Sequence, residues 1–338
     1  MRQSNLELCR IFSIMLVVLV HSCFGWIGWP EDIRSCDVPL LFVEALSCIG
    51  VNVFVILTGY FSTSIKAKSI INLLYICLFY AIVRLVVGYF TGNIEIKDIF
   101  FISRSNWFIP TYLGLVFFTP WLNAIEMNKK MGGALLLLIF HQVWFGYFPS
   151  LAEVSPGYQY GYSIISFTIL YLIARYIRLV GLPSWMSKYS LLIYFLSTML
   201  IAVEAYTLLY FFSGKSDKIP DGLNHYVYAY NNPLVIISAL SFFLFFEKLK
   251  MKQSKMINYI AKSVLAVLLI HGSAVLNIPM IKYFNGIYYS YRGLFLVLLW
   301  VAGLFAILLV SIVIDQIRIY SYKIIEPNIN KLLKKKGK

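Results

Sequence analysis

Long apolar runs, separated by short polar segments, recur along the whole chain. A transmembrane helix needs about 20 mostly apolar residues, and ten segments meet this requirement: 8–25, 40–62, 70–91, 106–124, 132–149, 160–180, 188–212, 229–247, 256–280 and 293–315. The loops between them are too short to hold a soluble domain. The pattern therefore predicts an all-α polytopic membrane protein, a bundle of about ten transmembrane helices.

The composition agrees with a membrane location and excludes several other classes of protein. The 338 residues are 60% hydrophobic and only 13% charged, whereas soluble domains average about 45–50% apolar and about 25% charged residues. Five cysteines without a C-x-x-C pair support neither a zinc site nor a disulfide framework. We therefore expect no metal ion and no permanently bound cofactor.

The charged residues indicate how the chain is oriented in the bilayer. With a cytoplasmic amino terminus, the inner segments hold 21 of the 29 Lys and Arg residues. This is the positive-inside distribution of a multi-pass protein with both termini in the cytoplasm. The net charge of +14 is thus an orientation signal and does not indicate nucleic-acid binding. We expect one membrane-embedded domain over residues 1–325 and a basic cytoplasmic tail over 326–338 that contacts the membrane surface.

A few ionisable side chains lie within the predicted spans, where a charge costs roughly 2.5–3.5 kcal/mol at mid-span. They are His21, Glu44, Arg84, His141, Glu204 and His271, with Arg10 near the inner end of the first span. Five of them fall in the outer half of the predicted bundle, which suggests a hydrated cavity that opens outward. Glu44, Arg84 and Glu204 also fit a structural role as bridges between helices, and His141 fits a packed histidine. His225 falls in an outer loop and is expected to be solvated.

Arg10 and His21 form the most informative pair of these side chains. They are eleven residues apart, so in a helix they share one face and lie about 16.5 Å apart along the axis. Arginine binds phosphate bidentately, and a neutral imidazole accepts a proton from a hydroxyl. The pair therefore suits a donor with phosphates at one end and a reactive group on an extended arm, such as acyl-coenzyme A. The alternative is that Arg10 reaches lipid headgroups and His21 bonds a neighbouring helix.

Four short motifs follow one another along the chain. They are Glu7, Arg10 and His21 at spacings of three and eleven; Val53 to Thr58-Gly59-Tyr60; the segment that begins Trp107-Phe-Ile-Pro; and Ile260-Ala-Lys-Ser through to His271. In this order they resemble the bacterial integral-membrane acyltransferase-3 family, over essentially the whole chain. Thr58 stands where that family more often has serine, and Leu268 where it has tyrosine.

The resemblance implies transfer of an acyl group, usually acetyl, from cytoplasmic acyl-CoA to a hydroxyl of an envelope or exported polysaccharide or a lipid-linked sugar. His21 is then the general base. Arg10 binds or positions the donor phosphates, and Glu7 orients Arg10 through an i, i+3 pair. His21 could instead carry the acyl group in a two-step route, but direct transfer is the preferred hypothesis.

Other positions of the resemblance leave their roles open. Thr58, Tyr60 or a backbone amide near Gly59 could stabilise the oxyanion. The family often has Arg-x-x-Arg after the second span, whereas this chain has Lys66 and Lys68, which attract phosphate without the planar fork of arginine. Trp107 belongs with these residues to the expected donor or motif region, and the secondary candidates for the site are His271, Glu44 and Arg84.

Two other classes of function fit the same composition. A transporter or flippase for an envelope glycolipid would use the ionisable groups to line a polar passage, although the chain shows no inverted repeat. A non-enzymatic partner of a polysaccharide-assembly complex would not need Arg10 and His21 on one face. The expected location is the bacterial plasma (inner) membrane, with acyl-CoA, a saccharide acceptor and the lipid bilayer as partners.

Overall fold

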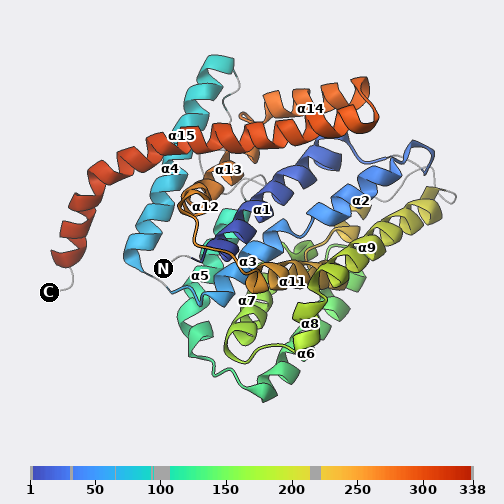
Figure 1. Cartoon of the computed structure of the whole chain (residues 1–338), viewed down its shortest axis with the longest axis horizontal. Helices are drawn as coiled ribbons and strands as arrows, with labels where there is room; N and C mark the ends of the chain where they lie inside the picture. Colours follow the sequence, from blue (N-terminus) through green and yellow to red (C-terminus); the bar gives the residue numbers. More distant parts are fainter. Residues whose placement is uncertain are drawn as a thin grey trace. The chain divides into compact units, whose positions relative to one another are not determined.

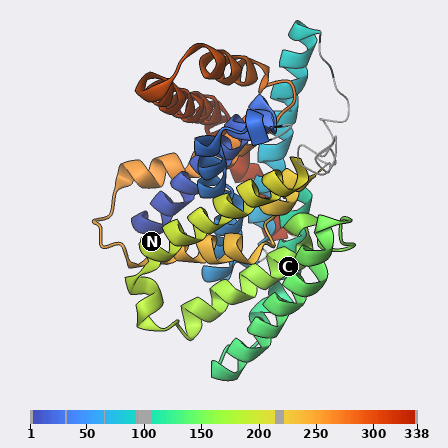
Figure 2. The ribbon, with the colours of Figure 1, turned by 90° about the vertical axis from the view of Figure 1, so that its right-hand side faces the viewer.

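The computed structural model describes residues 3–30, 33–64, 66–92, 94, 107–213 and 222–335. Within these ranges the regular structure is helical and contains no β-strand (Figures 1 and 2). The chain divides into two compact units, Met1–Thr63 with Trp121–Asn258, and Ser64–Pro120 with Tyr259–Lys338. Helix α5 (Phe108–Ala124) contributes to both, because the boundary falls at Pro120.

The first unit is built around the buried helix α3 (Gly50–Tyr60). All of its 11 residues except Phe54 and Thr58 are buried, because it packs against α1 (Ser4–Val20), α7 (Ile164–Leu179) and α11 (Pro233–Lys248). The other helices of this unit are α2 (Val38–Ser47), α6 (Lys129–Gln142), α8 (Ser184–Lys188), α9 (Ser190–Ser213) and α10 (Leu223–Val227).

Two glycines allow α3 to approach its neighbours at backbone distance. A Cβ atom at Gly50 would lie 2.7 Å from the carbonyl oxygen of Ser13 in α1. A Cβ atom at Gly59 would lie 2.8 Å from the Cα of Tyr171 in α7 and would collide with its carbonyl oxygen. Both distances are shorter than van der Waals contact, so only glycine fits there without a backbone shift. The close α1–α3 contact therefore fixes the position of α3 along the axis of α1. The position of α2, which directly precedes α3, follows from it.

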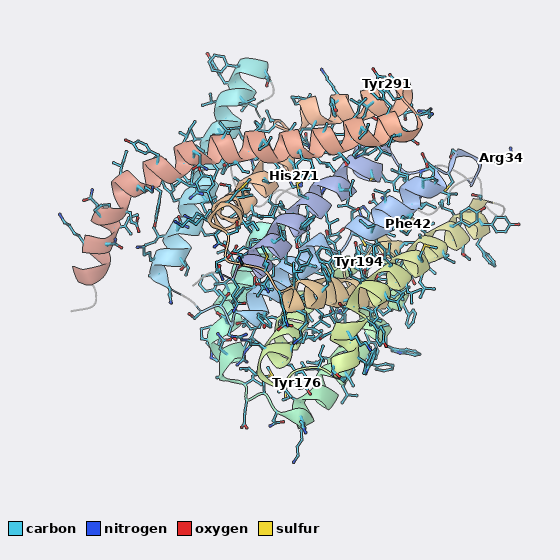
Figure 3. The ribbon with its side chains drawn as sticks, viewed as in Figure 1. Arg34, Phe42, Tyr176, Tyr194, His271 and Tyr291 are labelled. Carbon is cyan, nitrogen blue, oxygen red and sulfur yellow. The ribbon has the colours of Figure 1, made fainter. Side chains whose placement is uncertain are left out.

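Helix α9 packs beside α2 and α11. Tyr194 of α9 donates a hydrogen bond to the carbonyl oxygen of Leu46 in α2 at 2.8 Å, and its ring centroid lies 5.3 Å from that of Phe242 in α11 (Figure 3). Other positions of α9, such as Leu192 and Leu196, are exposed. Exposed large apolar side chains on a long apolar helix are typical of a lipid-facing surface.

The second unit contains α4 (Ala67–Thr91), α13 (Val264–His271), α14 (Ile278–Ser290) and α15 (Gly293–Lys335), and the boundary at Asn258 falls within α12 (Lys255–Ile260). Helix α14 lies along the first part of α15 in both ribbon views (Figures 1 and 2). A buried polar cluster joins α4 to α15: Tyr80 donates to Asp315 at 3.1 Å, and Arg318 binds both carboxylate oxygens of Asp315 at 2.9 and 2.6 Å. Each member has its partner, so this cluster is structural.

Six helical segments of the described residues are long and apolar enough to cross a membrane. They are Ser4–Gly25, Val38–Tyr60, Ala67–Thr91, Lys129–Leu151, Ser190–Ser213 and Gly293–Lys331. Each overlaps one of the ten predicted spans, so the prediction of an all-α multi-pass membrane protein is confirmed at this level. The number ten and the cytoplasmic placement of both termini stay predictions.

The other four predicted spans are shorter or broken. Helices α5, α7 and α11 have 17, 16 and 16 residues, slightly fewer than a bilayer requires of a straight helix. The predicted span 256–280 is divided: α12 passes through a 3-10 turn, Ala261–Ser263, into α13, which ends at His271. At the other end of the chain, α15 continues to Lys335, so most of the predicted tail 326–338 is helical.

Candidate functional site

His21 lies where the helical geometry of the first span changes. Helix α1 ends at Val20, and His21–Gly25 form a π-helical turn in which Cys23 has non-helical dihedral angles (φ −81°, ψ −122°). Such π-helical turns are rare and frequently occur at functional sites. The Nδ1 atom of His21 lies 2.6 Å from the carbonyl oxygen of Val17. A carbonyl can only accept, so Nδ1 carries the hydrogen and Nε2 is the basic nitrogen of the neutral ring.

A cavity of about 130 Å³ lies against this turn. Its lining includes His21, Glu44, Tyr162, His225, Tyr228 and Tyr230. These residues belong to the first unit and come from four separate parts of its sequence. The sequence predicted a polar cavity, and the structure brings two of its candidates, His21 and Glu44, to one cavity.

Glu44 reaches the cavity from α2. Asp37 caps this helix by accepting a hydrogen bond from the backbone N–H of Leu40 at 3.2 Å, and Pro39 occupies its first turn. The Glu44 side chain lies beside the backbone N–H of Phe24 and the thiol of Cys23. The residue is only 7% exposed, and among the described residues its Oε2 atom has no hydrogen-bond partner.

The tyrosines of the cavity are held by backbone contacts between distant segments. Gly161 has φ +87°, and a Cβ atom there would lie 2.6 Å from the backbone nitrogen of Asn231, so only glycine allows this close approach. The backbone N–H of Tyr230 donates to the carbonyl of Tyr160 at 2.9 Å, and Asn52 donates to the carbonyl of Tyr230 at 2.9 Å. The rings of Tyr162 and Tyr230 then meet edge to face at 4.9 Å.

His225 is a cavity residue that the sequence analysis assigned to solvent. It lies in α10, which begins after Gly222 (φ +96°), and its ring centroid is 6.0 Å from that of Tyr160. The residue is exposed, as the sequence analysis expected, and partial burial of its ring lowers its pKa from the ordinary value. The histidine is therefore neutral at pH 7. The sequence signal that could have found it is the run of alternating aromatic residues that follows it, at Tyr226, Tyr228 and Tyr230.

A second polar cluster lies at the other end of the first unit, where helix ends meet. Arg10 binds Glu7 at 2.5 Å, and its side chain is 27% exposed. Asn5 donates to the carbonyl of Phe246 at the end of α11 at 2.9 Å. Arg10 lies eleven residues before His21, or about 16.5 Å along a helix. The paired arginine thus lies in the second turn of α1, and the cavity histidine directly follows the last residue of this helix.

The Thr58-Gly59-Tyr60 motif belongs to this second end. Tyr60 donates to Glu247 at 3.1 Å and accepts from Arg178 at 3.1 Å, and the Arg178 guanidinium lies 5.0 Å above the Tyr60 ring. Thr58 donates to the carbonyl of Phe54 at 2.9 Å, and Gly59 is a packing residue. None of the motif's three residues is among those that line the described cavity.

The remaining sequence candidates belong to the second unit. Lys68 forms an ion pair with Glu326 at 2.6 Å, and Lys66 is the exposed residue before α4. Arg84 donates to the carbonyl of Leu269 at 2.8 Å. His271, at the end of α13, has its Nδ1 atom 2.6 Å from the carbonyl oxygen of Val267 (Figure 3). Trp107 directly precedes α5 and accepts a hydrogen bond from Thr111.

Two further ionisable residues of the first unit have structural partners. His141 shares a hydrogen bond of 2.6 Å with Tyr158. Glu204 accepts hydrogen bonds from Tyr147 and, at 3.0 Å, from Asn232. Over the described ranges, no three His, Cys, Asp or Glu side chains gather in a way that could hold a metal ion.

Comparison with known proteins identifies the family of the chain. A family model described as an acyltransferase domain matches residues 3–316. No curated protein and no solved structure gives a significant match. The family match covers nearly the whole chain and includes both ends of α1, and the six long apolar helices agree with a membrane enzyme. The chain therefore belongs to the acyltransferase-3 family and is a multi-pass membrane acyltransferase.

Proposed function

We propose that this enzyme transfers an acyl group, in the first instance acetyl, from cytoplasmic acyl-CoA to a hydroxyl of an envelope saccharide or lipid-linked sugar. The observation that carries the proposal is the position of His21. Its Nδ1–H is bound to Val17, its ring lines a cavity, and the same helix has a carboxylate-bound arginine about 16.5 Å away.

The proposed reaction is a direct transfer with His21 as general base. The acceptor hydroxyl enters the cavity, and Nε2 of His21 takes its proton as the oxygen attacks the thioester carbonyl. The new C–O bond forms, the C–S bond breaks, and the CoA thiolate leaves and receives the proton from the imidazolium. Tyrosine hydroxyls of the cavity lining can donate to the oxyanion that develops during the attack. None of the described residues that line the cavity is Lys or Arg. The negative charge of the oxyanion is therefore stabilised by hydrogen-bond dipoles.

The donor phosphates are proposed to bind at the other end of α1. Glu7 holds one edge of the Arg10 guanidinium, and the group has five N–H donors in all, so others are available for phosphate. Arg178 adds a second, exposed guanidinium at the helix ends of the same unit, stacked on Tyr60. The acyl arm of the donor then extends along α1 towards His21.

The direct test uses radiolabelled acetyl-CoA and membranes that contain the enzyme. We expect label to appear as a base-labile ester in the envelope glycan fraction, and not in membranes without the enzyme. Release of free acetate without any glycan ester would contradict a saccharide acceptor.

Arg10→Lys is expected to raise the KM for acetyl-CoA about tenfold while kcat changes less. A lysine keeps the positive charge but loses the planar, bidentate geometry, a difference of the order of one charge-assisted hydrogen bond. Initial rates over a range of acetyl-CoA concentrations measure it. Lys130→Ala is the matched control, because Lys130 is an exposed cation at the start of α6 that has no assigned role. An unchanged KM in Arg10→Lys would contradict donor binding at this residue.

A further inference from the structure

Glu44 is a buried carboxyl that the proposed reaction leaves without a role. The residue shares the lining of the cavity with His21 and is only 7% exposed. The backbone N–H of Phe24 and the thiol of Cys23 face its carboxyl group, whereas its Oε2 atom has no hydrogen-bond partner among the described residues. A buried polar group of this kind lowers stability unless the occupant of the cavity forms a hydrogen bond with it.

The surroundings of Glu44 favour the neutral form of its carboxyl group. None of the described lining residues is Lys or Arg. The imidazole of His21 is the neutral proton acceptor of the proposed reaction, with its Nδ1–H bonded to Val17 O, and His225 is neutral at pH 7. A carboxylate buried without a compensating cation costs much more free energy than a carboxylic acid does, so the group keeps its proton.

A neutral carboxyl group is a hydrogen-bond donor as well as an acceptor. The N–H of Phe24 and the thiol of Cys23 supply donors to the group, so its carbonyl oxygen is satisfied. The acid hydrogen is then on Oε2, where no described residue accepts it. A carboxylic acid that an apolar site keeps neutral can donate to an oxyanion as negative charge develops.

The cavity holds the base and the acid hydrogen in one small volume. About 130 Å³ has room for a few groups the size of a water molecule, which suits the acetyl carbonyl of the donor and the attacking hydroxyl. The hydroxyl of Tyr228, another lining residue, already donates to the carbonyl of Leu41 at 3.3 Å. The hydrogen on Glu44 Oε2 has no such acceptor among the described residues and is available to the substrate.

The geometry points to Glu44 as a catalytic residue that donates a hydrogen bond from its neutral carboxyl group to the carbonyl oxygen of the thioester. As His21 takes the proton of the acceptor hydroxyl and the C–O bond forms, negative charge develops on that carbonyl oxygen and is stabilised by the Oε2–H. The acid hydrogen stays on Glu44, and the charge passes to sulfur when the C–S bond breaks. This inference rests on the proposed acyl transfer and identifies a group that stabilises its oxyanion.

Substitutions that keep or remove the donor test this role. Glu44→Gln retains N–H donors on a side chain of the same length, whereas Glu44→Met has a similar length and no donor. The rate of CoA release from acetyl-CoA is measured for the purified enzymes in phospholipid nanodiscs, with envelope glycan and with water alone as acceptor. Glu204→Gln is the matched control, because Glu204 is bound by Tyr147 and Asn232 and does not line the cavity.

We expect Glu44→Met to lower kcat by about 10²- to 10³-fold, the usual effect of removing one oxyanion donor. Glu44→Gln should keep kcat within about tenfold of the wild-type value, because an amide N–H replaces the acid hydrogen as a neutral donor. The KM for acetyl-CoA should not change in either variant. Glu204→Gln should keep the wild-type kcat after correction for the amount of folded enzyme.

Infrared spectroscopy measures the protonation of Glu44 without turnover. The difference spectrum between wild type and Glu44→Gln should contain the C=O stretch of a protonated carboxyl group. This band should shift when the enzyme binds a ketone analogue of acetyl-CoA in which a methylene group replaces the thioester sulfur, because the acid hydrogen then bonds the ketone oxygen.

A carboxylate band in place of the acid band, or no shift with the ketone analogue, would overturn the inference. A kcat of folded Glu44→Met within tenfold of the wild-type value would also overturn it, as would a loss in Glu44→Gln as large as in Glu44→Met. Release of CoA to water that depends on Glu44 in the expected way, without ester on the glycan, would instead support the donor role and contradict the saccharide acceptor.

Discussion

Replacing His21 with glutamine is expected to reduce the rate of acyl transfer by about 10²- to 10⁴-fold, the usual contribution of a general base. Glutamine has a similar length and its amide N–H can replace the hydrogen bond to Val17 O. It cannot accept the proton of the acceptor hydroxyl. The loss should therefore appear in kcat, while the KM for acetyl-CoA stays near the wild-type value because Arg10 is intact.

The control for this prediction is a second histidine of the same unit. His141→Gln removes an imidazole that bonds Tyr158 and does not line the cavity at His21. We expect this variant to keep most of the transfer rate after correction for the amount of folded enzyme. A fully inserted His21→Gln enzyme with wild-type kcat would show that another group takes the proton.

Gly59→Ala is expected to destabilise the folded enzyme by about 3 kcal/mol, the upper end of the cost of overpacking. The new Cβ atom would lie 2.8 Å from Tyr171 Cα and 2.9 Å from Ala174 Cβ. Because the nearest obstacles are backbone atoms of α7, no side-chain rotation relieves the collision, and α3 and α7 must separate. Thermal unfolding of the purified protein in detergent should show a clearly lower transition temperature.

Gly133→Ala is expected to raise the unfolding temperature in the same experiment. Gly133 lies in α6, and a Cβ atom there would meet nothing within 4 Å. Alanine in a helix interior stabilises by roughly 0.5–1 kcal/mol relative to glycine. An unfolding temperature of Gly59→Ala equal to that of wild type would contradict the close packing of α3 on α7.

The sequence predicts the parts of the fold that depend on local apolar runs. Segments such as 190–213 are continuous, long and free of Pro, and the structure contains them as single helices. The sequence does not predict where helices break, and this is clearest at 256–280. There the apolar pattern continues through a 3-10 turn after Ile260 and past the end of α13 at His271. Hydropathy does not detect such breaks, because the residues on either side remain apolar.

The candidate site was predictable where it depends on one helix. The spacing of Glu7 and Arg10 predicts an i, i+3 ion pair, and the structure contains this pair at 2.5 Å. The spacing of Arg10 and His21 predicts their separation along the first helix. The cavity depends on contacts between segments far apart in sequence, such as Asn52 with the carbonyl of Tyr230. No local pattern encodes these contacts, so the meeting of His225 and Glu44 at one cavity is found only in the structure.

The central claim is that the donor binds at one end of α1 and the acceptor at the other, on opposite sides of the membrane. The most direct measurement uses sealed vesicles of a single orientation, established by labelling a cysteine introduced within residues 248–256, which the charge distribution predicts to lie on the inner face. Radiolabelled acetyl-CoA is supplied only on that face and a p-nitrophenyl glucoside only on the opposite face. We predict labelled ester on the glucoside in intact vesicles. Ester formation only when donor and acceptor share one face would contradict the claim.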